Sequence, residues 1–209
     1  MSYDHTTSIR DFLSAAAAKQ PAPGGGSVAA LAGALGAAMG EMVLNYSVGR
    51  KNLAAFEPEL KSALVELARA RELLLQLMAE DQAAYEALTA AKKLPADLPE
   101  RQQQLDVALL ACIRVPQALG ATALAVLQLA DRMVEKVNVY LLSDLAVCCE
   151  LSMATVRCAV YNVRANLPDV TDPQDRKQVE ATAQKLLDRA LPVIGRAIPA
   201  IWKRHSNPA

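Results

Sequence analysis

The sequence predicts an all-α fold, an up-and-down bundle of about five to six long helices. Apolar residues recur at helical spacing through nearly every long segment, and no segment alternates as a strand would. The 209 residues include forty alanines but only 4% aromatic side chains, so the helices are thin and can pack closely. The length suits a single helical domain that spans residues 1–209.

Caps and prolines set the expected helix boundaries. Ser8 and Ser27 can each act as the N-cap of a following helix, and Asp172 with Pro173 has the order typical of a cap and a first turn. An internal proline predicts a kink in the fourth helix, and two more are expected to bend or break the last. The expected helices cover residues 8–19, 27–48, 58–93, 99–135, 139–166 and 173 onward, with internal prolines at 116, 192 and 199.

Small residues line one side of the second expected helix. Gly33, Gly36, Ala37 and Gly40 follow one another at spacings of three, one and three, which places them on one helical face. Such side chains let another backbone approach closely. The pattern therefore places this helix in the core or at a subunit interface. Short connections make neighbouring helices antiparallel.

Composition excludes several classes of function. Lysine plus arginine and aspartate plus glutamate both number 22, so no basic surface points to nucleic acid or to a membrane. The only histidines, His5 and His205, lie near the ends, which disfavours histidine catalysis and a metal site. Four cysteines form no C-x-x-C pair and are expected to be buried thiols. No signal peptide is recognised, and the apolar run 28–40 is short for a bilayer, so we expect a cytoplasmic protein.

The segment 21–27, Pro-Ala-Pro-Gly-Gly-Gly-Ser, is the most unusual in the chain. It lacks the preceding strand of a dinucleotide fold and the lysine of a P-loop. Two interpretations stay open: a hinge between helices, or a ligand site in which glycines allow close approach and helix amides face an anion or a polar ring edge. The candidate substrate-binding residues here are Pro23, Gly24, Gly25, Gly26 and Ser27.

Asp81 is the candidate catalytic residue. It shares one helical stripe with Tyr85, Leu88 and Lys92, within a segment rich in alanine and leucine. Desolvation there would raise the pKa of its carboxyl group and suit it to general acid/base chemistry. The alternative is a solvent-facing carboxylate beside Glu80.

Other polar groups interrupt apolar runs. Glu41 and Asp144 are carboxylates in such runs, where an unpaired charge is costly. Asp144 is expected to meet Arg50, Lys51 or Asn138. The basic pairs at 50–51 and 92–93 fit solvated helix ends as well as an anion site.

A series of motifs follows a fixed order between residues 8 and 185. They are Pro-Ala-Pro-Gly-Gly-Gly-Ser-Val-Ala-Ala at 21–30, Gly-Arg-Lys at 49–51, Asp-Gln-Ala-Ala-Tyr at 81–85, Lys-Leu-Pro at 93–95, Val-Pro at 115–116, Asn138 with Ser-Asp-Leu at 143–145, and Tyr-Asn-Val at 161–163 before Asn-Leu-Pro-Asp-Val-Thr-Asp at 166–172. This series resembles the cyclodeaminase/cyclohydrolase family of folate one-carbon metabolism. The chain departs from the family pattern at Val137, where glycine is frequent, and at Cys148 and Cys149, where small residues are usual.

The resemblance implies a homodimer of all-α subunits that binds a tetrahydrofolate derivative in a cleft, with no cofactor or metal. It implies either ring closure of 5-formiminotetrahydrofolate with release of ammonia, or hydrolysis of 5,10-methenyltetrahydrofolate to 10-formyltetrahydrofolate. Asp81 matches the family's proposed acid/base residue. The other implied or candidate site residues are Pro23, Gly24, Gly25, Gly26, Ser27, Glu41, Arg50, Lys51, Tyr85, Lys93, Asn138, Ser143 and Asp144.

Two other functions remain as alternatives to an enzyme. The first is a non-catalytic helical protein that binds folate or serves as a scaffold. The second is a plain oligomerisation bundle in which the glycine segment is only a hinge.

Overall fold

The computed structural model describes residues 3–206, which contain helices and no strand. This confirms the predicted all-α bundle. The long helices are α1 (Ile9–Ala17), α2 (Gly25–Asn45), α3 (Glu57–Lys92), α4 (Arg101–Met133), α5 (Leu142–Asn166) and α6 (Pro173–Ser206). Short 3-10 helices cover Lys51–Phe56, Val139–Leu141 and Leu167–Asp169.

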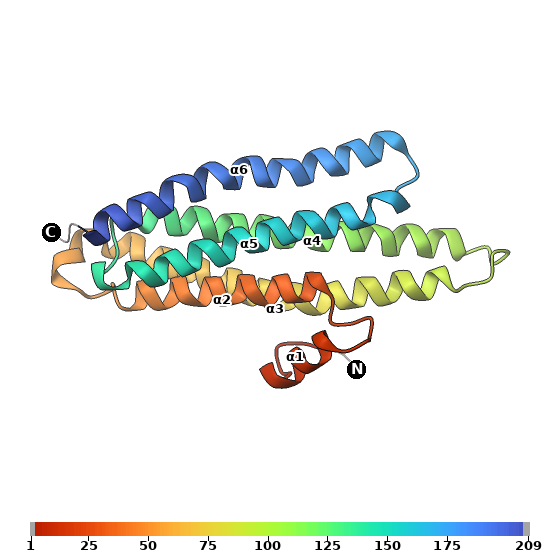
Figure 1. The fold of residues 1–209 in the computed structure, drawn as a ribbon, viewed down its shortest axis with the longest axis horizontal. Helices are drawn as coiled ribbons and strands as arrows, with labels where there is room; N and C mark the ends of the chain where they lie inside the picture. The colour runs from red at the N-terminus through yellow and green to blue at the C-terminus, as the bar shows by residue number, and fades with distance from the viewer. Residues whose placement is uncertain (1–2, 207–209) are drawn as a thin grey trace.

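Helices α2 to α6 lie side by side along one axis, and α1 stands away from them (Figure 1). Phe12 is the residue of α1 that reaches the core. Helices α3 and α4 extend beyond the N-terminus of α2 and the C-terminus of α5 (Figure 1). We call this projecting part, residues 81–112, the tip.

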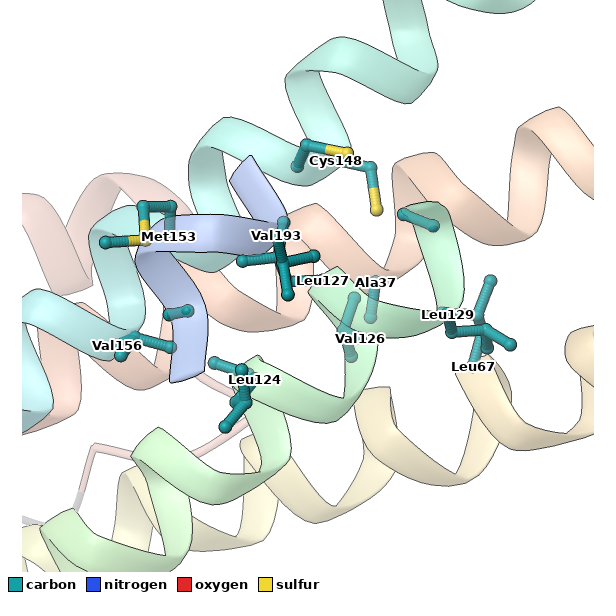
Figure 2. Packing of buried hydrophobic residues seen from close by; sticks show 14 of the residues in the cluster. Ala37, Leu67, Leu124, Val126, Leu127, Leu129, Cys148, Met153, Val156 and Val193 are labelled. Atoms are coloured by element: carbon teal, nitrogen blue, oxygen red, sulfur yellow. The ribbon is translucent and has the colours of Figure 1, made fainter. Parts of the chain in front are cut away.

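Glycines allow α2 to sit between α3 and α5. A Cβ atom on Gly33 would lie 3.0 Å from a Thr155 side-chain atom, and one on Gly40 would lie 2.9 Å from Leu67. Aliphatic side chains of α3, α4, α5 and α6 fill the core alongside (Figure 2). The small residues of α2 therefore face the core, which is one of the two places that the sequence predicted for this helix.

The start of α2 differs from the expectation. Gly24 is the N-cap, and Ser27 lies in the first turn of the helix. The Ser27 side chain is fully buried and points to α3, so it does not cap its own helix. The prediction that Ser27 is the N-cap was wrong because its hydroxyl group has partners in another helix.

The prolines of α4 and α6 do not break these helices. Helix α6 is continuous through Pro192 and Pro199. Its start was predicted correctly, since the Asp172 carboxylate accepts the backbone N–H groups of Gln174 and Asp175 at 2.7 and 2.9 Å. Helix α4 continues through Pro116.

Pro116 has a consequence near the tip. Proline has no N–H group, so it leaves the carbonyl of the residue four positions earlier, Cys112, without its helical donor. The Asn166 side chain donates to this carbonyl at 3.1 Å. The proline therefore allows the end of α5 to be fastened to α4.

The cysteines are buried thiols, as predicted, at three of four positions. Cys112, Cys148 and Cys149 are buried, whereas Cys158 is partly exposed. Burial raises the pKa of Cys148 to about 12, so this thiol stays protonated at neutral pH.

Three stretches of residues 3–206 are long and apolar enough to cross a membrane by length and composition alone. They are Gly25–Asn45, Arg101–Met133 and Val139–Asp169. In an apolar 18-residue segment of each stretch, 56%, 44% and 50% of the segment respectively is buried inside the bundle. The complete helix α2 is thus longer than the apolar run that the sequence suggested.

Candidate active site

The Asp81 carboxyl group lies against the first turn of α2. Its Oδ2 atom is 3.1 Å from Ser27 Oγ, and the Ser27 backbone N–H also donates to the carboxyl group. A Cβ atom built on Gly26 would lie 1.9 Å from Asp81 Oδ1. Only glycine at position 26 therefore leaves room for the carboxyl group in this position.

Burial raises the pKa of Asp81, and the hydrogen bonds from the Ser27 hydroxyl and backbone partly offset this effect. The side chain is partly buried, so the solvent-facing alternative does not describe it. Gly24 provides no side-chain cap for α2, and Asp81 supplies an acceptor for one free N–H of the first turn from a different helix.

Helix α5 adds two amides to this end of α2. The Asn162 side chain donates to the Cys158 carbonyl at 2.9 Å, while its Oδ1 atom faces Gly25, 3.5 Å from where a Cβ would lie. The Asn166 side chain donates to the Asn162 carbonyl at 2.9 Å. Asn162 was not among the predicted site residues, although its spacing of four from Asn166 and from Cys158 puts all three on one helical face.

The rest of the predicted stripe on α3 is spread along the tip. Tyr85 is exposed and Leu88 is buried. Lys92 forms an ion pair of 2.6 Å with Asp169, and Lys93 is exposed at the end of α3. The prediction that these residues share one helical face is therefore correct, but the residues differ in burial and in partners.

Two grooves lie beside the tip, and neither is lined by Asp81. One, about 830 Å³, is lined mainly by alanines of α3 and α4. The other, about 770 Å³, lies between the tip and the start of α6 and includes Lys92. In the described single chain, Asp81 is thus partly exposed outside both grooves.

Five other candidate residues lie at the opposite end of α2, about 30 Å away by the rise of a 21-residue helix. We call this the far end, and the end with Asp81 the glycine end. Asn138 is tied to the far end of α2, since its N–H donates to Ser47 Oγ at 2.9 Å. The residues concerned are Arg50, Lys51, Asn138, Ser143 and Asp144.

The expected pairing of Asp144 is wrong. Arg50 Nε donates to the Tyr46 carbonyl at 2.9 Å, and Asn138 Oδ1 accepts the backbone N–H of Tyr140 at 3.2 Å. Within residues 3–206, neither of them, nor Lys51, is bound to Asp144. Asp144 is only partly buried, in the first turn of α5, where water and the helix dipole both favour a carboxylate.

Glu41 has a partner that the sequence did not predict. Its Oε1 atom is 2.7 Å from Arg71 Nε of α3. This ion pair compensates the charge of Glu41, which lies in an otherwise apolar stretch of α2.

Comparison with known proteins assigns the family. Residues 8–185 match the formiminotransferase-cyclodeaminase family. The chain belongs to this family. A methenyltetrahydrofolate cyclohydrolase of Methylorubrum extorquens is 34% identical over 168 residues, which is 78% of this chain and 81% of that protein.

A longer relative and a solved structure support the same family. Formimidoyltransferase-cyclodeaminase of Gallus gallus is 30% identical over 205 residues, or 96% of this chain, but the match covers only 38% of that protein. The crystal structure of formiminotetrahydrofolate cyclodeaminase from Thermotoga maritima has a TM-score of 0.87 at 25% identity, covering 95% of this chain and 97% of that one. The family predicted from the motifs is confirmed.

Proposed function

We propose that this protein is an enzyme of folate one-carbon metabolism that closes 5-formiminotetrahydrofolate to 5,10-methenyltetrahydrofolate, hydrolyses the methenyl compound to 10-formyltetrahydrofolate, or both. The observation that carries the proposal is the Asp81 carboxyl group, held against Gly26 and Ser27 with its pKa raised by burial. Relatives whose names state these two activities support it.

The chemistry needs a proton donor and acceptor at the one-carbon unit. Asp81 would exchange protons with the reacting nitrogen or water, a role that typically contributes about 10²–10⁴-fold in rate. The reaction as proposed uses no metal and no redox cofactor. Asn162 and the glycine segment would bind the polar edge of the pterin ring, because amides and helix N–H groups match its donors and acceptors.

The activity test uses the purified protein with each substrate separately. Appearance of methenyl absorbance with ammonia release is expected for the cyclodeaminase, and loss of that absorbance for the cyclohydrolase. Asp81→Asn should lower either rate by about 10²–10⁴-fold without unfolding the bundle. Folate binding without turnover would favour the non-catalytic alternative, and absence of any folate-dependent thermal shift would favour the plain bundle.

We also propose that the enzyme is a homodimer. Exposed or partly exposed side chains, most of them apolar, follow heptad spacing on α2 and on α5, which pack against each other. We infer that together they form one exposed face, which we call the α2/α5 face. Such spacing is typical of a helix seam that packs against further helices. The positions are Val28, Ala32, Leu35, Met39 and Met42 on α2 with Tyr46 at its C-cap, and Asp144, Val147, Leu151, Ala154, Cys158 and Tyr161 on α5 with Tyr140 in the 3-10 helix before it.

A two-fold axis through this face would bring each end of α2 close to the opposite end of α2 in the partner subunit. An axis perpendicular to the helices makes each helix antiparallel to its copy, so the far end of one subunit meets the glycine end of the other. Arg50 and Lys51 of one subunit would then lie beside Asp81 of its partner. Their charges would suit the glutamate tail of the folate. This arrangement explains why Asp81 lies outside the grooves of a single chain.

Mixed dimers test the shared site. Asp81→Asn and the double variant Arg50→Ala, Lys51→Ala should each have low activity alone. Random mixing of subunits leaves half the dimers mixed, each with one site that has all three native residues, so about a quarter of wild-type activity should return. No recovery after subunit exchange would contradict a site built from two subunits.

The remaining expectations are also part of the proposal. We place the enzyme in the cytoplasm, with a folate as its partner and neither nucleic acid nor a membrane. Fractionation of cells and measurement of the native mass would test location and dimerisation.

A further inference from the structure

A series of hydrogen bonds joins the start of the glycine segment, residues 21–27, to α3. The Gln82 side chain accepts the backbone N–H of Tyr3 through Oε1 at 2.9 Å. The phenol oxygen of Tyr3 in turn accepts from Gln20 Nε2 at 3.0 Å, and the same Nε2 group donates to the Ala22 carbonyl at 2.7 Å. We call this series, which runs from α3 through the N-terminal residues to Ala22, the N-terminal tie.

Gln82 is a firm anchor for the N-terminal tie. Its side chain is buried, and its Nε2 group donates to Glu86 Oε1 at 2.7 Å. A carboxylate accepts and a backbone N–H donates, so these two contacts together fix which end of the Gln82 amide faces Tyr3. Tyr3 packs against the main core, and Phe12 is buried in it. The tie therefore joins groups that the bundle already holds in place.

The glycine segment needs such contacts because its backbone has unusual freedom. Three consecutive glycines at 24–26 can adopt many backbone conformations, whereas the start of α2 requires one. Asp81 holds the segment on the α2 side through Ser27. The N-terminal tie holds the other side at Ala22. Two adjacent residues of α3, Asp81 and Gln82, thus restrain both sides of the three glycines.

We propose that Gln20 and Gln82 are positioning residues that keep the glycine segment in the conformation that receives the polar edge of the pterin ring. This inference rests on the proposed function for its ligand, but not for its geometry. Both glutamines act through the backbone at Ala22 rather than on the reacting atoms. Loss of the tie lowers the fraction of molecules that are ready to bind, so the apparent affinity falls by the same factor. Asp81 stays in place, because Ser27 holds it from the buried first turn of α2.

The kinetic test compares KM with kcat for whichever of the two folate compounds is turned over. Tyr3→Phe is the mildest variant, because it removes the phenol oxygen and keeps the backbone N–H that binds Gln82. It should raise KM by about 3- to 10-fold, the size expected for one hydrogen bond, and change kcat by less than about 2-fold. Gln20→Met and Gln82→Met remove the amide groups and should raise KM at least as much. A fall in kcat with unchanged KM would overturn the proposal, because it would place the effect at Asp81.

Ser8→Ala is the matched control for these variants. Ser8 Oγ caps α1 by accepting the N–H of Asp11 at 3.1 Å, so its loss loosens the same N-terminal region without removing a contact of the tie. KM should not change in Ser8→Ala. An equal rise of KM in the control would show that general loosening is responsible, and would overturn the assignment of the two glutamines.

Amide hydrogen exchange of the free protein tests the geometry without substrate. The Val28 N–H donates to the Gly24 carbonyl at 3.1 Å, so its exchange rate reports whether Gly24 is held in place. This rate should rise by about 3- to 10-fold in Tyr3→Phe. The N–H of Val48, which donates to the Leu44 carbonyl at the far end at 2.9 Å, should exchange as in wild type.

The exchange result separates this inference from the proposed function. Unchanged exchange at Val28 in both Tyr3→Phe and Gln20→Met would overturn the role of the N-terminal tie. If neither folate compound is turned over while exchange at Val28 becomes faster, the proposed function fails and positioning by the tie stands.

Discussion

The two ends of α2 hold their candidate residues differently. At the glycine end, Asp81 is placed by contacts with Gly26 and Ser27, in a position that another side chain would disturb. At the far end, Arg50 and Lys51 are exposed, and Arg50 Nε donates to the backbone carbonyl of Tyr46. A proton-transfer group needs a fixed position and a tuned pKa, whereas charges that recognise a ligand work from an open surface.

The largest effect is expected from a substitution that disturbs the glycine end. Gly26→Ala places a methyl group where the Asp81 carboxyl group lies, 1.9 Å from Oδ1, so Asp81 must move. We expect kcat to fall by about 10²–10⁴-fold, close to the effect of losing the acid/base group.

Gly120→Ala is the matched control for Gly26→Ala. Its methyl group would lie 2.8 Å from Leu186 in the core, so it also crowds the bundle but leaves Asp81 in place. It should lower thermal stability and keep kcat. Equal losses of kcat in both variants would show that crowding alone, rather than the position of Asp81, limits the reaction.

The pH dependence of stability tests the raised pKa of Asp81 at the glycine end. Because burial raises the pKa of Asp81 above 3.8, the folded chain binds its proton more tightly than the unfolded chain. The free energy of unfolding therefore falls as pH rises from 3.8 through the raised pKa, and this cost is fully present above it. Asp81→Asn removes the cost, so the variant should be at least as stable as wild type at neutral pH.

Urea unfolding of both proteins at about pH 8 and at about pH 5 measures the difference in stability. The advantage of Asp81→Asn should shrink as the pH is lowered. An advantage that grows toward acid pH would mean that the folded state favours ionised Asp81.

The smallest effect is expected toward the far end. The Glu41–Arg71 ion pair has side chains 17% and 34% exposed, so Glu41→Gln should cost up to about 1 kcal/mol of stability. Because Arg71 already binds Glu41, the KM for the folate should not change. A clearly higher KM would return Glu41 to the binding residues that the sequence predicted.

The sequence predicted the helices well because their ends are set by local chemistry. Asp172 caps α6 as expected from its own neighbours. Ser27 was misassigned because its partners lie on α3, 51 and 54 residues away, and no local rule reports them. Tertiary contacts decided that helix start.

The candidate site was predicted as one group, and the structure divides it. Helix α2 separates the residues by its own length, which the sequence could have shown from 21 residues at about 1.5 Å each. The heptad positions of α2 and α5 could also be counted in the sequence. The sequence could not show which apolar face of each helix is exposed, because exposure depends on which helices are neighbours.

Asp81 lies between two separate clusters of buried side chains. Met78, one turn earlier on α3, belongs to the main core, whereas Ala84 and Leu88 pack with Ala108 and Cys112 in a small cluster within the tip. Clusters that share few side chains can unfold locally and independently. Amide hydrogens of the tip should therefore exchange faster than those of the main core. Opening of the part of the tip beyond Asp81 would let a bulky substrate come and go while Ser27 and Gly26, anchored in the slower unit, keep the acid in place.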